Sequence, residues 1–234
     1  MRYSTVLFDV GDTLLSVPKP APIYQELLTS YGCSVCVEDV EQILAETKRL
    51  IDEQVPNWVT EDFVLDSTAS TRRRMMHVDT IISLSGVSCP EVARATFLNL
   101  YVGTEFFTIF PDVAETLDAL RSAGYRLGIV SNWESRLLEL CAAHGIAEAF
   151  DFAVVSEIEG YSKPHPHLYR RALELAGVPA NQVIHVGDKL REDVEGAASV
   201  GIRAVLLDRS ARSTDQYEPR IQTLTDLPAI LATL

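Results

Sequence analysis

A set of polar residues lies at or near the ends of apolar runs, and their types could carry out chemistry together. Taken singly, each has an ordinary structural explanation, because Asp and Ser cap helices, lysine is solvated and a Gly-Asp pair forms turns. Two carboxylates, a hydroxyl and an amine at successive strand ends of one parallel sheet would instead converge on a single crevice. The residues are Asp9, Ser131, Asn132, Lys163, Asp188 and Asp193.

Such a crevice is suited to phosphoryl transfer. Two carboxylates can share a hard divalent cation, and Mg²⁺ accepts few protein oxygens while it binds substrate phosphate directly. An aspartate can attack phosphorus once the metal and a lysine have neutralised the charge repulsion, which forms an aspartyl-phosphate that water later hydrolyses. We therefore expect Mg²⁺ as the cofactor and a small phosphorylated molecule as the substrate.

The elements that must position these residues alternate along the chain. Apolar runs without polar alternation predict buried parallel strands, and the segments between them predict helices that end at Gly124, Gly145, Gly177 and Gly201. This order predicts an α/β fold, a Rossmann-like doubly wound parallel sheet with its ligand at the carboxyl ends of the strands. The expected strands are 6–8, 127–130, 152–155, 183–186 and 204–207, and the expected helices are 113–123, 135–144, 166–176 and 193–200.

About a hundred residues separate the first strand from the others, and this interval predicts helices only. We expect a helical cap domain at 17–107, inserted into a core formed by 1–16 and 108–234. The expected cap helices are 24–31, 37–51, 70–85 and 91–101.

Composition excludes several classes of protein. The net charge is -13, from 33 acidic against 20 basic residues, so the surface should repel nucleic acid, and the run 72–74 fits a solvated helix face. No apolar stretch of ~20 residues and no secretion signal are visible, so we expect a soluble, cytoplasmic protein that does not enter a membrane. Cys33 and Cys36 have a C-x-x-C spacing but no further ligand pair that would indicate zinc.

Across the whole chain these residues resemble, in order and spacing, the four motifs of the haloacid dehalogenase-like (HAD) hydrolase superfamily. The resemblance implies that Asp9 is the nucleophile and a metal ligand, and that Ser131, with Asn132 beside it, binds phosphate. It further implies that Lys163 bridges the nucleophile and the phosphate. The helical insertion is similar to the family's cap, which closes over the site and selects the substrate.

The same resemblance implies a metal site. Asp188 would be the second metal carboxylate, Asp193 would lie in the outer shell, and the carbonyl of Gly11 would complete the protein ligands. The segments around His185–Asp188 and Leu206–Arg209 resemble the rhythmically-expressed-gene-2-like branch. His185 itself is expected to be a packed core histidine rather than a catalytic base.

The chain departs from the family pattern in its first motif, because Gly11 occupies the place of a second aspartate that protonates the leaving group. General acid–base catalysis of this kind typically contributes ~10²–10⁴ in rate. Asp12 could substitute for it or could merely cap the turn; the leaving group could need little protonation, or a cap residue could supply the proton. The site could also bind phospho-ligands with little turnover, as a sensor or partner protein.

Two other family chemistries also dispense with the second aspartate. A 2-haloacid dehalogenase works without metal, and the paired Asp188 and Asp193 argue against it. Phosphonate cleavage needs an imine-forming lysine in the cap, for which Lys48 is the only reasonable candidate. The substrate is not assigned, although Trp133 could bound the entrance and a pocket could be lined by Trp58, Phe63, Met75, Met76 and Phe97.

Overall fold

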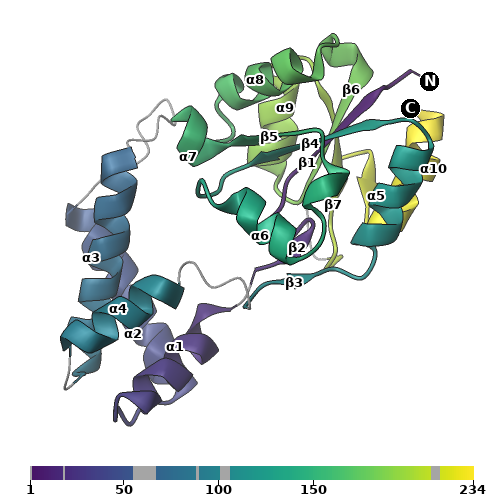
Figure 1. Ribbon diagram of the computed structural model, residues 1–234. Helices are drawn as coiled ribbons and strands as arrows, with labels where there is room; N and C mark the ends of the chain where they lie inside the picture. The colour runs from purple at the N-terminus through teal and green to yellow at the C-terminus, as the bar shows by residue number, and fades with distance from the viewer. Residues whose placement is uncertain (1, 18, 55–66, 88–89, 101–105, 212–216) are drawn as a thin grey trace. The chain divides into compact units, whose positions relative to one another are not determined.

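The structure is a computed structural model that describes the chain except for residues 1, 18, 55–66, 88–89, 101–105 and 212–216. The chain divides into two compact units. One unit bears the main sheet and contains the described residues up to Val17 and from Phe107 onward. The described residues of the other form four helices, and each unit is described by itself (Figure 1).

The sheet-bearing unit has six parallel strands in the order β5-β4-β1-β6-β7-β8. The chain runs from β1 to β4 and β5 on one side, then returns to place β6, β7 and β8 on the other. This reversal beside β1 is the switch point at which open α/β sheets bind ligands. The strands are β1 (Thr5–Phe8), β4 (Arg126–Ser131), β5 (Phe152–Val155), β6 (Val183–Gly187), β7 (Arg203–Leu207) and β8 (Arg220–Ile221).

Both faces of this sheet are covered by helices, which is why its strands are apolar without alternation. Val6 and Phe8 of β1 belong to one buried cluster, whereas Leu7 between them belongs to the other. The predicted doubly wound fold is therefore confirmed. The helices of this unit are α5 (Val113–Ser122), α6 (Leu137–Ala143), α7 (Ser156–Glu159), α8 (Pro166–Ala176), α9 (Gly196–Ala198) and α10 (Leu227–Thr233).

The helix predicted at 193–200 is different in the structure. A π-helical turn, η4 (Leu190–Glu195), begins three residues earlier, and α9 ends at Ala198. Asp193 donates its backbone N–H to the carbonyl of Lys189 at 2.8 Å and accepts the Lys189 N–H with Oδ2 at 3.0 Å. The side chain of Asp193 thus closes the turn, and this contact draws the helix start toward β6.

Short elements complete this unit. The two-residue strands β2 (Leu15–Ser16) and β3 (Thr108–Ile109) pair antiparallel, which ties the outgoing chain to the returning chain. The 3₁₀ turns are η2 (Ala147–Ala149), η3 (Ala180–Gln182) and η5 (Leu224–Asp226).

The helical unit contains α1 (Pro20–Ser30), α2 (Val37–Gln54), α3 (Ser67–Ser85) and α4 (Pro90–Leu100), and each helix packs on the next. The predicted helices are present, with α1 and α3 starting several residues earlier than expected. Phe97 is fully buried and stacks on Tyr24, with ring centroids 5.4 Å apart. Phe97 is therefore a core residue of the unit, whereas Met75 is 39% exposed.

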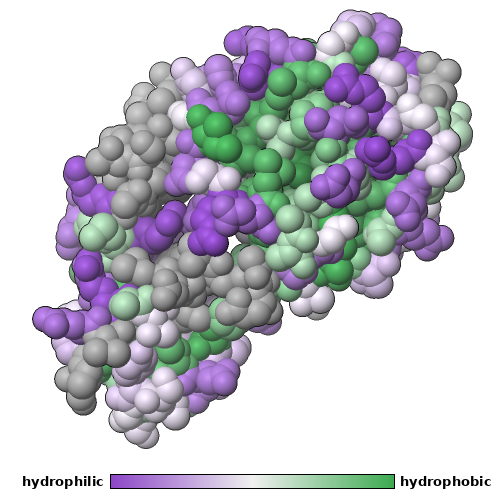
Figure 2. Space-filling view, viewed as in Figure 1, coloured by the Kyte–Doolittle hydropathy of each residue, from purple (hydrophilic) through white to green (hydrophobic). Residues whose placement is uncertain are grey.

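The hydropathy of the visible surface differs from place to place. Figure 2 shows hydrophilic side chains spread over the visible face, with hydrophobic ones gathered mainly over the sheet-bearing unit. Among the described residues, no helix has both the length and the apolar character that a membrane span requires.

Candidate active site

Asp9 follows β1 directly, at the carboxyl end of the sheet, and is almost completely buried. Its backbone N–H donates to the carbonyl of Val186 on β6 at 2.9 Å, so the neighbouring strand holds it in place. Ser131, the last residue of β4, donates from Oγ to Asp9 Oδ1 at 3.0 Å. Lys163 donates from Nζ to the same oxygen at 2.6 Å. One carboxylate oxygen thus accepts a hydroxyl and an ammonium from two separate segments.

The Asn132 side chain positions Lys163. Asn132 Oδ1 accepts the backbone N–H of Lys163 at 2.6 Å, and Asn132 Nδ2 donates to the Lys163 carbonyl at 3.0 Å. This pair of hydrogen bonds fixes the loop between α7 and α8 against the end of β4. The amide is occupied by the Lys163 backbone, and direct phosphate binding by Asn132 stays a prediction.

The Lys163 ammonium is 2% exposed and lies between two carboxylates, because Nζ also donates to Asp193 Oδ1 at 2.6 Å. Burial by itself would lower the pKa of Lys163, but the charges of Asp193 and Asp9 raise it well above its ordinary value. The amine is therefore held in its charged form. It offsets two buried negative charges that would otherwise be costly.

Asp193 is held on both carboxylate oxygens. His185 Nε2 lies 3.1 Å from Oδ1, and the backbone N–H of Lys189 donates to Oδ2. Burial raises the pKa of Asp193, but Lys163 and His185 outweigh burial and hold the pKa below its ordinary value. A Cβ on Gly187 would lie 2.2 Å from Asp193 Cγ, so glycine is required there for this close approach.

Asp188 is the carboxylate without a partner. Its Oδ1 is buried with no hydrogen bond, and burial together with the charges of Asp9 and Asp193 raises its pKa to about 7. Carboxylate oxygens of Asp9, Asp188 and Asp193 all lie within 4.8 Å of one another. Oxygen ligands at this spacing fit a hard divalent cation, which would supply the missing partner of Asp188. Within the described part of the chain, they form the one such acidic or metal-ligating cluster.

The structure also places the residues whose roles the sequence left open. Asp12 is exposed, has a φ of 54°, and accepts the backbone N–H of Val17 with Oδ1 at 3.1 Å. The Asp12 carboxylate therefore caps the turn in this structure. Lys48 is exposed on α2, as expected of an ordinary surface lysine. Trp58 and Phe63 lie outside the described residues.

His185 is fully buried on β6, and its expected packing in the core is confirmed. Its hydrogen bond to Asp193 was not expected, because strand periodicity cannot show which neighbour a buried ring meets. Arg209 was also missed: its guanidinium donates to Asp112 and, at 2.7 Å, to the carbonyl of Thr13. This contact ties the loop after Asp9 to the returning chain. The sequence could not reveal it, because the partners of Arg209 are distant along the chain.

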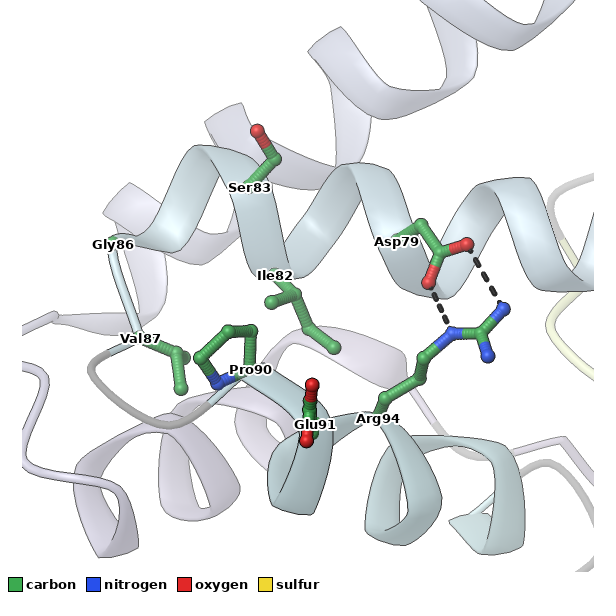
Figure 3. Close-up of a pocket in the computed structure, with 8 residues that line it drawn as sticks. All are labelled: Asp79, Ile82, Ser83, Gly86, Val87, Pro90, Glu91 and Arg94. Carbon is green, nitrogen blue, oxygen red and sulfur yellow. Dashed lines mark hydrogen bonds and ion pairs between the residues drawn. The ribbon is translucent and has the colours of Figure 1, made fainter.

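A separate groove of about 430 Å³ lies between α3 and α4 of the helical unit (Figure 3). Two of its charged residues, Asp79 and Arg94, pair with each other, with Nη2 3.1 Å from Oδ2, and Glu91 is the third charged residue of the lining. The other lining residues are mainly small or apolar, including Ile82, Val87 and Pro90. Among the described residues, the cluster of acidic side chains that could hold a metal lies at the strand ends of the sheet and not in this groove.

Comparisons with known proteins show the family to which the chain belongs. A model of the haloacid dehalogenase-like hydrolase family matches residues 3–201. The chain is 31% identical over 234 residues to haloacid dehalogenase-like hydrolase domain-containing protein 3 of Danio rerio, covering 97% of this chain and 95% of that protein. It is 30% identical to a glyceraldehyde 3-phosphate phosphatase of Pyrococcus abyssi, covering 86% of this chain and 79% of the relative.

A solved 2-haloacid dehalogenase of Pseudomonas syringae is similar over 99% of both chains, with a TM-score of 0.69 and 25% identity. The branch resembling rhythmically-expressed-gene-2-like proteins is untested by these similarities and stays a prediction. The match to the family covers most of the chain, including every residue of the acidic cluster. The chain therefore belongs to the haloacid dehalogenase-like hydrolases and is a hydrolase.

Proposed function

We propose that this hydrolase is a Mg²⁺-dependent phosphatase of a small phosphorylated molecule and forms an aspartyl-phosphate on Asp9. The observation that carries the proposal is the shared oxygen of Asp9, which accepts both Ser131 Oγ and Lys163 Nζ beside two further carboxylates. A nucleophilic carboxylate needs nearby positive charge to approach a phosphate dianion. Lys163 supplies that charge, and its burial prevents water from screening it.

The surrounding residues orient the reaction. Ser131 and Lys163 would bind the transferring phosphoryl group, since both already donate to the oxygen that it must approach. Asn132 would act through Lys163, whose backbone it holds. Contacts that fix donors in advance lower the reorganisation needed in the transition state.

The metal site would use Asp9, Asp188 and the carbonyl of Gly11, with Asp193 in the outer shell. Asp193 suits this outer position because Lys163, His185 and the Lys189 N–H already occupy its oxygens. HAD hydrolases generally use a divalent metal, and the unpartnered Asp188 supports one here. When bound, Mg²⁺ would reduce the negative charge of the nucleophile and the phosphate together.

A relative named for glyceraldehyde 3-phosphate supports a small phosphorylated metabolite as the substrate class. The acidic cluster disfavours metal-free 2-haloacid dehalogenation, because Asp188 would then add uncompensated negative charge beside a carboxylate substrate.

The test measures phosphate release from p-nitrophenyl phosphate and acetyl phosphate, with Mg²⁺ or EDTA, for the wild type and Asp9→Asn. We expect Mg²⁺-dependent turnover that falls by at least ~10³ in the variant, because an amide cannot replace the nucleophile. Asp118→Asn, the same chemical change at an exposed position of α5, should retain full activity.

Other outcomes would point to other functions. Thermal stabilisation by phosphate-bearing ligands without phosphate release would indicate a binding protein. Release of halide from a 2-haloacid in EDTA would indicate a dehalogenase.

A further inference from the structure

The loop after Asp9 leaves little room for a side chain at position 11. A Cβ on Gly11 would lie 3.2 Å from Trp133 Cζ3 and 3.3 Å from Val17 Cγ2. Both distances are tighter than ordinary van der Waals contacts, so the indole and the valine fill the space in which a side chain from this position would stand. Gly11 therefore presents only its backbone to the site, and a side chain at this position would require the indole or Val17 to shift by a few tenths of an ångström.

Trp133 lies against the core in that place. Its backbone N–H donates to Ser156 Oγ at 3.0 Å, its carbonyl accepts from Ser156 Oγ and the Glu157 N–H, and its ring packs on Phe107 with centroids 5.4 Å apart. The partly buried ring also packs against the main core cluster. The indole thus forms part of the packed surroundings of Gly11.

The ionisable groups around Asp9 and Asp188 already have hydrogen-bond or ion-pair partners. Lys163 bonds two carboxylates, Asp193 accepts three donors, and the Asp12 carboxylate binds the Val17 N–H. Lys189 Nζ and Asn132 Nδ2 each lie 3.4 Å from Glu192 Oε2, His185 Nε2 lies 3.1 Å from Asp193 Oδ1, and the Tyr169 hydroxyl donates to the Glu192 carbonyl. Within the described residues of the sheet-bearing unit, the site is built to bind phosphate and metal, with no group placed to protonate a departing oxygen.

We propose that this site hydrolyses phosphorylated compounds whose leaving group departs as a stable anion, acyl phosphates above all, and that it discriminates against alkyl phosphates. The proposal rests on the phosphatase function proposed above and names the substrate class of that site. An alkoxide is too basic to leave without a proton, whereas a carboxylate leaves readily without one.

The reaction balances without an acid on the protein. Asp9 forms a bond to phosphorus while the bond from phosphorus to the acyl oxygen breaks, and that electron pair leaves on the carboxylate product. Water then attacks phosphorus, the bond to Asp9 breaks, its electron pair returns to the Asp9 carboxylate, and the proton of water passes to phosphate or solvent. Because no described group of the sheet-bearing unit is placed to activate that water, the second step should be slow and the phosphorylated enzyme should accumulate.

The test compares acetyl phosphate, p-nitrophenyl phosphate, phenyl phosphate and glyceraldehyde 3-phosphate with Mg²⁺ on the full chain. We expect kcat/KM to fall steeply as the leaving group becomes more basic, and acetyl phosphate to show a burst of about one acetate per enzyme. Equal kcat/KM values for acetyl phosphate and glyceraldehyde 3-phosphate would overturn the proposal. No Asp9-dependent release from any substrate would instead overturn the phosphatase function and this proposal with it.

A double variant separates intrinsic substrate reactivity from the enzyme. Gly11→Asp with Trp133→Ala opens the space and adds an acid, so the ratio of alkyl to acyl hydrolysis should rise by ~10²–10⁴ over the wild type. Gly11→Asn with Trp133→Ala has the same shape without the proton and should not raise the ratio. Thermal unfolding checks that both variants fold, and an equal rise in both would contradict the assignment.

Discussion

The sheet-bearing unit buries a cluster of charged residues, whereas the described ion pairs of the helical unit lie at the surface. The side chains of Lys163 and Asp193 are each 1% exposed, but those of Arg94 and Asp79 are 38% and 50% exposed. Exposed pairs contribute little to folding, and a buried carboxylate without a partner, such as Asp188, weakens it. The contrast is consistent with the proposed function, in which the buried charges would take part in the chemistry.

The largest expected effect is that of Lys163→Met, which leaves Asp9 and Asp193 buried without their common cation. In EDTA this change should destabilise the protein by about 3–5 kcal/mol, and with Mg²⁺ present it should abolish phosphate release. Urea unfolding measures the loss of stability. Lys189→Met, at a side chain that is 57% exposed, is the matched control and should cost much less. A loss below about 1 kcal/mol for Lys163→Met would contradict the view that the buried ammonium offsets two charges.

Phe97→Ala tests how much the apolar core, rather than the charged residues, contributes to the stability of the helical unit. Removing this fully buried ring, stacked on Tyr24, should cost about 3–5 kcal/mol in the helical unit. Met75→Ala, at a partly exposed position on α3, should cost little. Circular dichroism during heating follows the loss, and the thermal stabilisation by Mg²⁺ should persist if the metal is bound by the sheet-bearing unit alone.

Asp188→Asn tests repulsion within the acidic cluster. Because the pKa of Asp188 is raised from 3.8 to about 7, its ionisation destabilises the folded state, so without metal this group lowers stability as the pH rises from about 4 to 7. The variant should therefore be more stable than the wild type in EDTA at pH 8, by roughly 1–3 kcal/mol. It should also lose the stabilisation by Mg²⁺. Lower stability in EDTA would show that Asp188 is not repelled by its neighbours.

The smallest effect is expected for Arg94→Ala. The ion pair with Asp79 joins α3 to α4 at the surface, and such pairs contribute at most about 1 kcal/mol. A double-mutant cycle with Asp79→Ala, at low and high salt, measures the coupling. Coupling above about 2 kcal/mol would mean that charge matters as much in the helical unit as in the sheet-bearing unit.

Most of the fold could be predicted because long apolar runs and their intervals carry periodic information. The strand predicted at 152–155 is β5 with the same bounds, and α2 begins at Val37 as expected. The paired strands β2 and β3, and β8, were missed because two residues show no periodicity. The π-helical start at Leu190 was missed because it depends on the Asp193 side chain rather than on local propensity.

The sequence by itself determined which residues could take part in chemistry, because side-chain types at strand ends of a parallel sheet are placed at one edge by its topology. It also showed that position 11 carries no carboxylate. Tertiary structure alone decided that Lys163 bonds both Asp9 and Asp193, that Asp12 turns to Val17, and that Trp133 fills the space beside Gly11. These contacts join residues from separate segments, and their geometry depends on how the loops pack, which no local pattern encodes.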